Sequence, residues 1–335
     1  MNVQLMLSTV SVVVFLSGFV AAQSPERVLV VNTSDASVSV VNLVTMSEER
    51  REKVGMRPYG IAISRDRTKV AIGVEEEECV KFFSLPEFEL LGKTKIGPMH
   101  NDHIVLTQDG QSILVANFYS DDVVGIDVAT MKASFRIEGC SAPHVVKYGP
   151  LSHNAYVTCK KVTGIAIIDP TEQKLVKFHQ INVNPRSLTF SKDETKVYFG
   201  SFWVDGFFEM DAQSGKVLKL HALPTPQDNS EPQEVTYHGV EALSDSIVVA
   251  ANEGRSYVDA VDVTSGKLLD RLTDVSKPCC VERIPRSNLN GSVQFLVSNL
   301  GDGTLQVVAM SGSGKLTSKG KVSVGAGPKR VTFLD

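Results

Sequence analysis

Three features of the sequence predict an all-β fold made of seven similar units. An apolar, β-branched tetrapeptide recurs at residues 28, 70, 113, 155, 197, 247 and 295, with a spacing of about 42 residues in the first five copies. Each copy is followed by a turn and an alternating segment, such as Gly-Ile-Ala-Ile-Ile-Asp at 164–169. No segment has a sustained helical period. Repeats of this length with four short antiparallel strands are typical of propeller blades, so the sequence predicts a seven-bladed β-propeller.

The two ends of the repeat array predict how the ring closes. The array begins with a strand of the second type at Val28 and ends with a strand of the innermost type at 328–334. The C-terminal strand is therefore expected to join the N-terminal blade as its missing inner strand, which removes exposed edges. Residues 23–335 are expected to form this propeller as a single domain.

The N-terminal segment is predicted to be a signal peptide at residues 1–22. It has no charged side chain and ends with the small residues Ala21 and Ala22. The alternative is an uncleaved membrane anchor, because the apolar run approaches the length needed to span a bilayer. A secreted or secretory-pathway protein is expected to be a glycoprotein, and Asn32 and Asn290 lie in acceptor patterns.

Composition excludes some classes of partner. The net charge of −4 gives no sign of nucleic-acid binding, and no membrane contact is expected after the signal peptide is removed. We expect a monomer with a small-molecule partner.

The five cysteines suggest one disulfide and no common metal or redox motif. Cys140 precedes an inner strand and Cys159 ends the adjacent strand, so a bridge between them is plausible. The neighbours Cys279 and Cys280 should point to opposite faces of a strand and take part in packing. The absence of CxxC and CxxCH patterns excludes c-type haem attachment and the usual zinc and thioredoxin signatures.

A family resemblance rests on the blade pattern. A proline-led strand at 143–148, Tyr156-Val157-Thr158 and a strand ending at Asp169 resemble the YVTN repeats of seven-bladed propellers. Such repeats occur in surface-layer proteins and are similar to lactonase and amine-dehydrogenase propellers. In architecture the chain also resembles secreted propeller proteins of fungal specialised metabolism, some of which steer hetero-Diels–Alder cyclisations.

Residues at one face of the propeller are the candidates for function. The beginnings of the inner strands and the loops from second to third strands should surround a central funnel, where ligands commonly bind. Donors and acid–base groups there predict catalytic roles for His103, His144, Arg186 and His238. Aromatic and polar residues predict a ligand-binding wall made of Tyr59, His100, Asp102, Phe118, Tyr119, Trp203, Tyr237, Glu241 and Arg330.

These residues favour an enzyme that binds a hydrophobic, oxygen-bearing small molecule, and the resemblance to the fungal propeller proteins implies a role in secondary metabolism. The resemblance implies cofactor-free cyclisation of the hetero-Diels–Alder type, which needs orientation and polarisation of a carbonyl. One alternative is a lactonase-type hydrolase with a histidine base or a single divalent cation. Such a cation would be held by His100 and His103 with His144 or His238, and by Glu241. The other alternative is a non-catalytic binding or adhesion propeller.

Overall fold

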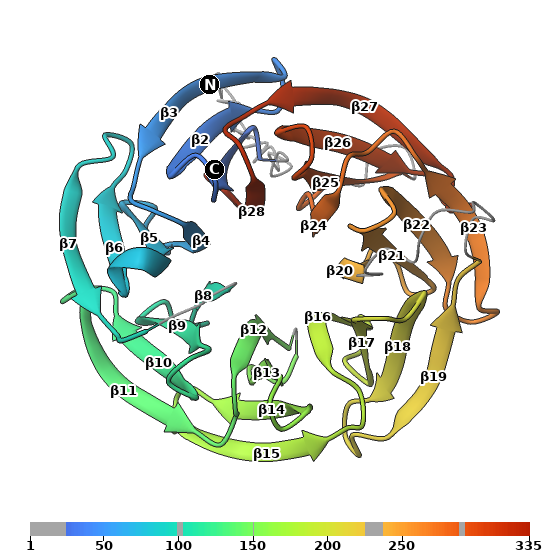
Figure 1. Ribbon diagram of the computed structural model, residues 1–335, viewed down its shortest axis with the longest axis horizontal. Coiled ribbons are helices and arrows are strands. Elements are labelled where there is room, and N and C mark those ends of the chain that lie inside the picture. The colour runs from blue at the N-terminus through green and yellow to red at the C-terminus, as the bar shows by residue number, and fades with distance from the viewer. Residues whose placement is uncertain (1–24, 99–102, 150, 225–236, 288–291) are drawn as a thin grey trace, which may run out of the picture.

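A computed structural model describes residues 25–98, 103–149, 151–224, 237–287 and 292–335. Seven four-stranded antiparallel sheets form a ring around a central axis, as the sequence predicts (Figure 1). The predicted signal peptide, His100, Asp102 and Asn290 lie outside the described residues. Within these ranges no helix is long and apolar enough to cross a bilayer.

Each blade runs from the axis to the rim in chain order, apart from the blade that contains both ends of the chain. The inner strands lie next to the axis: β4 (Pro58–Ile63), β8 (Ile104–Leu106), β12 (Pro143–Tyr148), β16 (Pro185–Phe190), β20 (Tyr237–Ala242), β24 (Pro278–Arg283) and β28 (Pro328–Phe333). The second strands are β1 (Arg27–Asn32), β5 (Lys69–Val74), β9 (Ser112–Asn117), β13 (Ala155–Cys159), β17 (Lys196–Ser201), β21 (Ile247–Asn252) and β25 (Val293–Asn299).

The third and outer strands complete the blades. The third strands are β2 (Ser37–Asn42), β6 (Cys79–Ser84), β10 (Asp122–Asp127), β14 (Gly164–Asp169), β18 (Gly206–Asp211), β22 (Tyr257–Asp262) and β26 (Thr304–Met310). The outer strands are β3 (Ser47–Lys53), β7 (Leu90–Lys95), β11 (Lys132–Glu138), β15 (Lys174–Gln180), β19 (Val217–Ala222), β23 (Lys267–Leu272) and β27 (Leu316–Ser323). A single-turn 3-10 helix, η1 (Glu75–Glu77), joins β5 to β6.

Position in the blade explains the hydrophobic patterns. Second and third strands are buried along nearly their whole length, because neighbouring blades cover both faces of each sheet. Outer strands such as β3 alternate between exposed and half-buried residues, since one of their edges and much of their surface meet water. The core is therefore divided into clusters between successive blades.

The ring closes through the pairing of β28 with β1, which confirms the predicted closure. Val30 lies opposite Val331 in this antiparallel pair. Beyond β28, the Asp335 carboxylate accepts hydrogen bonds from the backbone N–H groups of Glu26 and Arg27 and from the Arg27 guanidinium. The two ends of the chain are thus fastened to each other across one blade.

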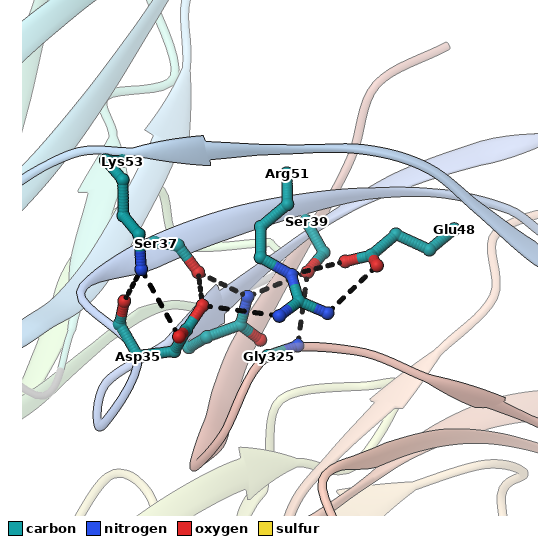
Figure 2. A network of polar contacts seen from close by, with 8 residues as sticks. Asp35, Ser37, Ser39, Glu48, Arg51, Lys53 and Gly325 are labelled. Carbon is teal, nitrogen blue, oxygen red and sulfur yellow. Dashed lines mark hydrogen bonds and ion pairs between the residues drawn. The ribbon is translucent and has the colours of Figure 1, made fainter.

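A polar network holds the segment before β28 against the first blade (Figure 2). The Gly325 N–H donates to Ser39 Oγ at 3.4 Å. The Asp35 carboxylate accepts from Ser37 Oγ at 2.6 Å, and Lys53 and Arg51 of β3 also contact it. These contacts join the loop after β1 to β2, β3 and the C-terminal segment.

Asn32 belongs to this network, and its place there does not fit the expected glycan. Its side chain is fully buried, and its amide donates to Ser37 Oγ at 3.0 Å and to Ser39 Oγ at 2.7 Å. A glycan on that nitrogen would have to displace the packed loop and both hydrogen bonds. The acceptor pattern alone could not indicate that Asn32 is buried, because the burial comes from the C-terminal segment, which covers the end of this second strand.

The predicted disulfide between Cys140 and Cys159 is present, with a Cα–Cα distance of 5.3 Å. It joins the segment before β12 to the end of β13, and both half-cystines are buried. The bridge fixes the beginning of one inner strand.

Candidate functional site

The inner strands send alternate side chains to two different places. Residues two apart in a strand point to the same side. In β24 the third and fifth residues, Cys280 and Glu282, line the central channel. The second residue contacts loops at the end where the inner strands begin, as His238 of β20 does with Glu253. The propeller therefore has two neighbouring polar clusters along its axis.

The first cluster surrounds a cavity of about 500 Å³, which we call the channel cavity. Strands β4, β8 and β28 supply apolar walls through Ile61, Val105, Leu106 and Phe333. Polar side chains also line it: Arg65, Arg67, His103, Lys147, Cys280, Glu282 and Arg330. The cavity thus brings together His103 and Arg330, two of the residues singled out from the sequence.

Lys147 and Glu241 form an ion pair beside this cavity, 2.6 Å apart. Their side chains are 26% and 11% exposed, so water screens the pair only partly. Burial by itself would lower the pKa of Lys147, but Glu241 and Glu282 more than offset this and raise it. Lys147 therefore remains a cation across the physiological pH range.

Glu282 is the carboxyl that lines the channel cavity, among the described residues. Burial raises its pKa to about 7 and Glu241 adds to the rise, whereas Lys147 and Arg330 oppose it. A carboxyl with a pKa near neutrality can either donate or accept a proton at working pH. Glu282 is accordingly suited to general acid–base chemistry on a molecule in the cavity.

The second cluster, which we call the funnel network, consists of Arg186, His238, Glu253 and Cys279. Arg186 Nη2 lies 2.8 Å from His238 Nε2, and Glu253 Oε2 lies 2.6 Å from His238 Nδ1. Cys279 Sγ is 3.4 Å from the same Nδ1. The Arg186 guanidinium also stacks on Phe202, 4.0 Å from the ring centroid. The network ties β16, β20, β24 and the loop after β21 together.

Arg186 decides the tautomer of His238. A guanidinium only donates, so Nε2 must accept and the ring proton must lie on Nδ1, where it is donated to Glu253. Burial would raise the pKa of Cys279, but His238 and Lys329 bring it below its ordinary value. Burial would likewise raise the pKa of Glu253, and His238 reverses this as a hydrogen-bond donor.

The funnel network is also the place to test for a metal. In the described part of the chain, His238, Glu253 and Cys279 are the one group of three potential ligands, with ligand atoms within 4.8 Å of one another. The expected ligands His103, His144 and Glu241 do not join His238 in any such group of described residues. Nδ1 carries the proton that an ion would have to replace, and Arg186 would then face an N–H on Nε2. The donor set therefore fits a hydrogen-bonded network better than a metal centre.

The same geometry argues against a cysteine nucleophile. A nucleophile–base pair needs a third group that orients the base through its other nitrogen. Here Glu253 and Cys279 share Nδ1, while Nε2 meets a cation. The ring nitrogen next to Cys279 has no lone pair with which to take up the thiol proton.

Other expected ligand-binding residues lie around the funnel without lining the channel cavity. Tyr59 is buried, with Lys329 4.7 Å from its ring centroid. His144 is buried edge-on to Phe118, which in turn contacts Tyr119. Tyr119 and Trp203 are surface residues, 58% and 71% exposed.

Tyr237 does not lie in the ligand-binding wall where the sequence places it. Its side chain is fully buried between blades, and its hydroxyl lies 3.2 Å from Asp259 and 3.3 Å from Tyr257. It packs in a core cluster with Tyr198 and Phe207. As the first residue of an inner strand, it turns toward the adjacent blade and away from the axis.

Sequence reasoning overlooked Lys147, Glu253, Cys279 and Glu282 as site residues. A signal for two of them was present. Lys147, Glu241 and Glu282 are each the fifth residue of a six-residue inner strand that is otherwise largely apolar. A charged residue at a repeated inner-strand position indicates a channel lining. Nothing comparable marks Glu253, which follows a second strand within a loop.

Comparisons with known structures agree with this fold. The chain resembles Pseudomonas aeruginosa periplasmic gluconolactonase PpgL, with a TM-score of 0.70, 18% identity and coverage of 92% of this chain and 98% of that chain. It also resembles Kuenenia stuttgartiensis hydrazine synthase, with a TM-score of 0.69, 14% identity and coverage of 91% of this chain and 98% of that chain. A third similar structure is the dihydro-heme d1 dehydrogenase NirN, with a TM-score of 0.65, 14% identity and coverage of 94% of this chain and 76% of that chain. The chain has the propeller fold of these proteins.

No protein-family model and no curated protein sequence matches the chain. At identities below one fifth, the structural similarities establish architecture alone. The resemblance to YVTN repeats and to cyclising propellers therefore remains a prediction, and function has to be argued from the residues themselves.

Proposed function

We propose that the protein is an enzyme whose channel cavity binds an apolar, oxygen-bearing small molecule and promotes its cyclisation without a cofactor. The reaction class is a hetero-Diels–Alder or related cycloaddition. The supporting observation is the position of Glu282, a carboxyl with a pKa of about 7 that faces an apolar-walled cavity of about 500 Å³.

The cavity supplies what such a reaction needs. Ile61, Leu106 and Phe333 offer an apolar surface that favours a folded, water-excluded conformation of the substrate. The negative charge that develops on a carbonyl oxygen would be stabilised by donors in place before the reaction. Lys147 and Arg330 supply positive charge at the same cavity.

Glu282 has the proton-donating role in this proposal. Up to about neutral pH its carboxyl is protonated in a large share of molecules and can donate a hydrogen bond to a substrate carbonyl. Above its pKa it becomes a carboxylate and can no longer donate. Cyclisation should therefore be fastest below about pH 7 and decline at higher pH.

Lactone hydrolysis is the second candidate, and the same residue favours it. An ionised Glu282 can accept a proton from an attacking water, with Arg330 near the oxyanion. The fold similarity to PpgL, described as a gluconolactonase, makes this reaction class worth testing. In this role activity would rise as Glu282 ionises, so the two candidates predict opposite pH dependence.

The test measures turnover of a panel of heterodiene–alkene substrates and a panel of lactones by liquid chromatography and mass spectrometry. Wild type is compared with Glu282→Gln from about pH 5.5 to about pH 8.5. Glutamine keeps an N–H donor, so cyclisation should fall about tenfold and lose its pH dependence. A general base has no such substitute, so hydrolysis should fall by about 10²–10⁴-fold.

Arg51→Met serves as the control variant, because Arg51 lies on the outer strand β3 and contacts Glu48. Conversion of neither panel, together with tight retention of one of the compounds, would replace both enzyme candidates with a non-catalytic binding propeller. Cyclisation that is unchanged in Glu282→Gln would remove the proposed donor.

We also propose that the protein is secreted. The apolar segment at residues 1–22 and the disulfide between Cys140 and Cys159 support an oxidising compartment. Expression of the full chain in a secreting host and N-terminal sequencing of the product test this. Intact protein retained inside the cells with Met1 present would contradict it.

A further inference from the structure

The channel cavity carries more positive than negative side chains, although the whole chain has a net charge of −4. Four cations line it: Arg65, Arg67, Lys147 and Arg330. Glu282 is the one carboxyl among the lining residues, all of which lie in the described part of the chain. A concave site with low-dielectric walls concentrates the field of such charges on its contents.

Carboxylates just outside the lining reduce this excess without removing it. Glu241 pairs with Lys147 at 2.6 Å, and Asp109 interacts electrostatically with Arg65. Asp109 is also held by Thr107, which donates to it at 2.6 Å. Four cations of the lining thus stand against Glu282, Glu241 and Asp109, and Glu282 is partly protonated near neutrality.

Burial makes this positive charge useful for binding. Arg330 is 6% exposed, and its guanidinium stays charged at any physiological pH. Arg330, Lys147, Cys280 and Glu282 also surround a narrow space of about 20 Å³ that continues the channel. A buried cation gains far more from an anionic ligand than an exposed one does, because little water screens the pair.

From this arrangement we infer that the ligand of the channel cavity is a small organic acid, whose carboxylate lies between Arg330 and Lys147 while its apolar body contacts Ile61, Val105 and Phe333. This inference rests on the proposed function, since it concerns the same cavity, and it specifies the substrate class. The apolar walls distinguish such an acid from an inorganic anion, which would leave them in contact with water.

Glu282 gives this binding a characteristic pH dependence. The groups that face it are Lys147 of β12, Glu241 of β20, Arg330 of β28, its strand neighbour Cys280 and His103, which lies just before β8. A ligand carboxylate would favour the protonated form of Glu282, which donates a hydrogen bond, and would be repelled by the ionised form. Binding should therefore take up protons near neutral pH and weaken as pH rises above about 7.

Isothermal titration calorimetry of the full-length protein with 2-naphthoate, the neutral isostere 2-naphthamide and inorganic phosphate tests the inference. We expect naphthoate to bind at least about tenfold more tightly than naphthamide, which is the usual gain from a charge-assisted hydrogen bond. Phosphate should bind more weakly than naphthoate. Titrations in two buffers of different ionisation enthalpy measure the proton uptake.

Variants locate the site. Arg330→Met should abolish the preference for the acid over the amide, Arg330→Lys should retain part of it, and Arg51→Met should leave it unchanged. Circular dichroism checks that each variant is folded, and the lysine variant keeps the test valid if the methionine variant unfolds.

The outcomes separate the inference from the proposed function. Equal binding of naphthoate and naphthamide would overturn the organic-acid inference and leave the small-molecule site intact. Binding of neither aromatic probe would overturn both. An acid preference that survives in Arg330→Met would also overturn the inference, because the anion would then lie elsewhere.

Discussion

Glu282 offers a direct test of the electrostatics of the channel through protein stability. Its pKa rises from the ordinary 4.5 to about 7 in the folded protein, chiefly through burial. The folded state then keeps a proton that the unfolded chain has already released. Stability from the protonated form is complete below about pH 4.5 and is lost as pH rises toward about 7.

The magnitude follows from the two pKa values. Each pKa unit corresponds to about 1.4 kcal/mol, so the full loss is about 3 kcal/mol before solvent screening of this half-buried group. Glutamine imitates the protonated carboxyl and does not titrate. Glu282→Gln should therefore gain about 2 to 3 kcal/mol in free energy of unfolding relative to wild type between about pH 5 and about pH 8.

Urea denaturation followed by far-UV circular dichroism at several pH values is the suitable assay. Fluorescence is less useful, because the single tryptophan, Trp203, is already 71% exposed in the folded protein. Glu172→Gln, an exposed change in the turn before β15, controls for the loss of a carboxylate. Parallel stability curves for wild type and Glu282→Gln would refute the raised pKa and, with it, the proton-donating role.

Four further predictions concern the framework. Replacing Cys140 and Cys159 together by serine should lower the free energy of unfolding by about 3 kcal/mol, given the sequence separation of 19, and dithiothreitol should then have no further effect on the urea midpoint. Tyr237→Phe should lower the free energy of unfolding by about 1 to 3 kcal/mol, because it removes the hydroxyl that donates to the buried Asp259 carboxylate. Naphthoate affinity should stay unchanged, and weaker binding would show that Tyr237 contacts the ligand after all. Gly200→Ala should destabilise strongly in thermal melts, because a Cβ would overlap the carbonyl oxygen of Tyr237, and a melt like that of wild type would contradict the packing. Asp259→Asn should lower the free energy of unfolding by about 3 to 5 kcal/mol, because it breaks the buried ion pair with Arg271, whose Nε lies 2.7 Å from the carboxylate. A loss below about 1 kcal/mol would be inconsistent with that pair.

The framework could be predicted from the sequence because each blade repeats the same physical problem. A second strand such as 155–159 must be apolar throughout, since blades cover both of its faces, and that demand recurs at regular intervals. Closure was also predictable, because an array that begins with a second strand lacks one inner strand, which β28 supplies.

The site was predicted less well because inner-strand landmarks do not reveal side-chain direction. Selecting residues at strand beginnings found Arg186 and His238, which do contact each other, but also Tyr237, which packs between blades. Register is the missing information, since a shift of one residue moves a side chain to the opposite face. Bulges at the beginning of inner strands, such as that between Tyr237 and Gly239, make this register hard to infer from spacing alone.

The adjacent cysteines of β24 point to different polar clusters. Cys279 belongs to the funnel network, where His238 and Lys329 offset burial and lower its pKa. Cys280 faces the channel cavity, where burial raises its pKa to about 12 against the weaker influence of Arg330. One residue type at consecutive positions thus experiences opposite electrostatic environments, because the strand sends them to opposite sides. The funnel network is held together by hydrogen bonds across three blades. The channel cavity instead combines open volume with a titratable carboxyl and excess positive charge. For that reason we place ligand chemistry at the third and fifth residues of the inner strands and a positioning role at the second.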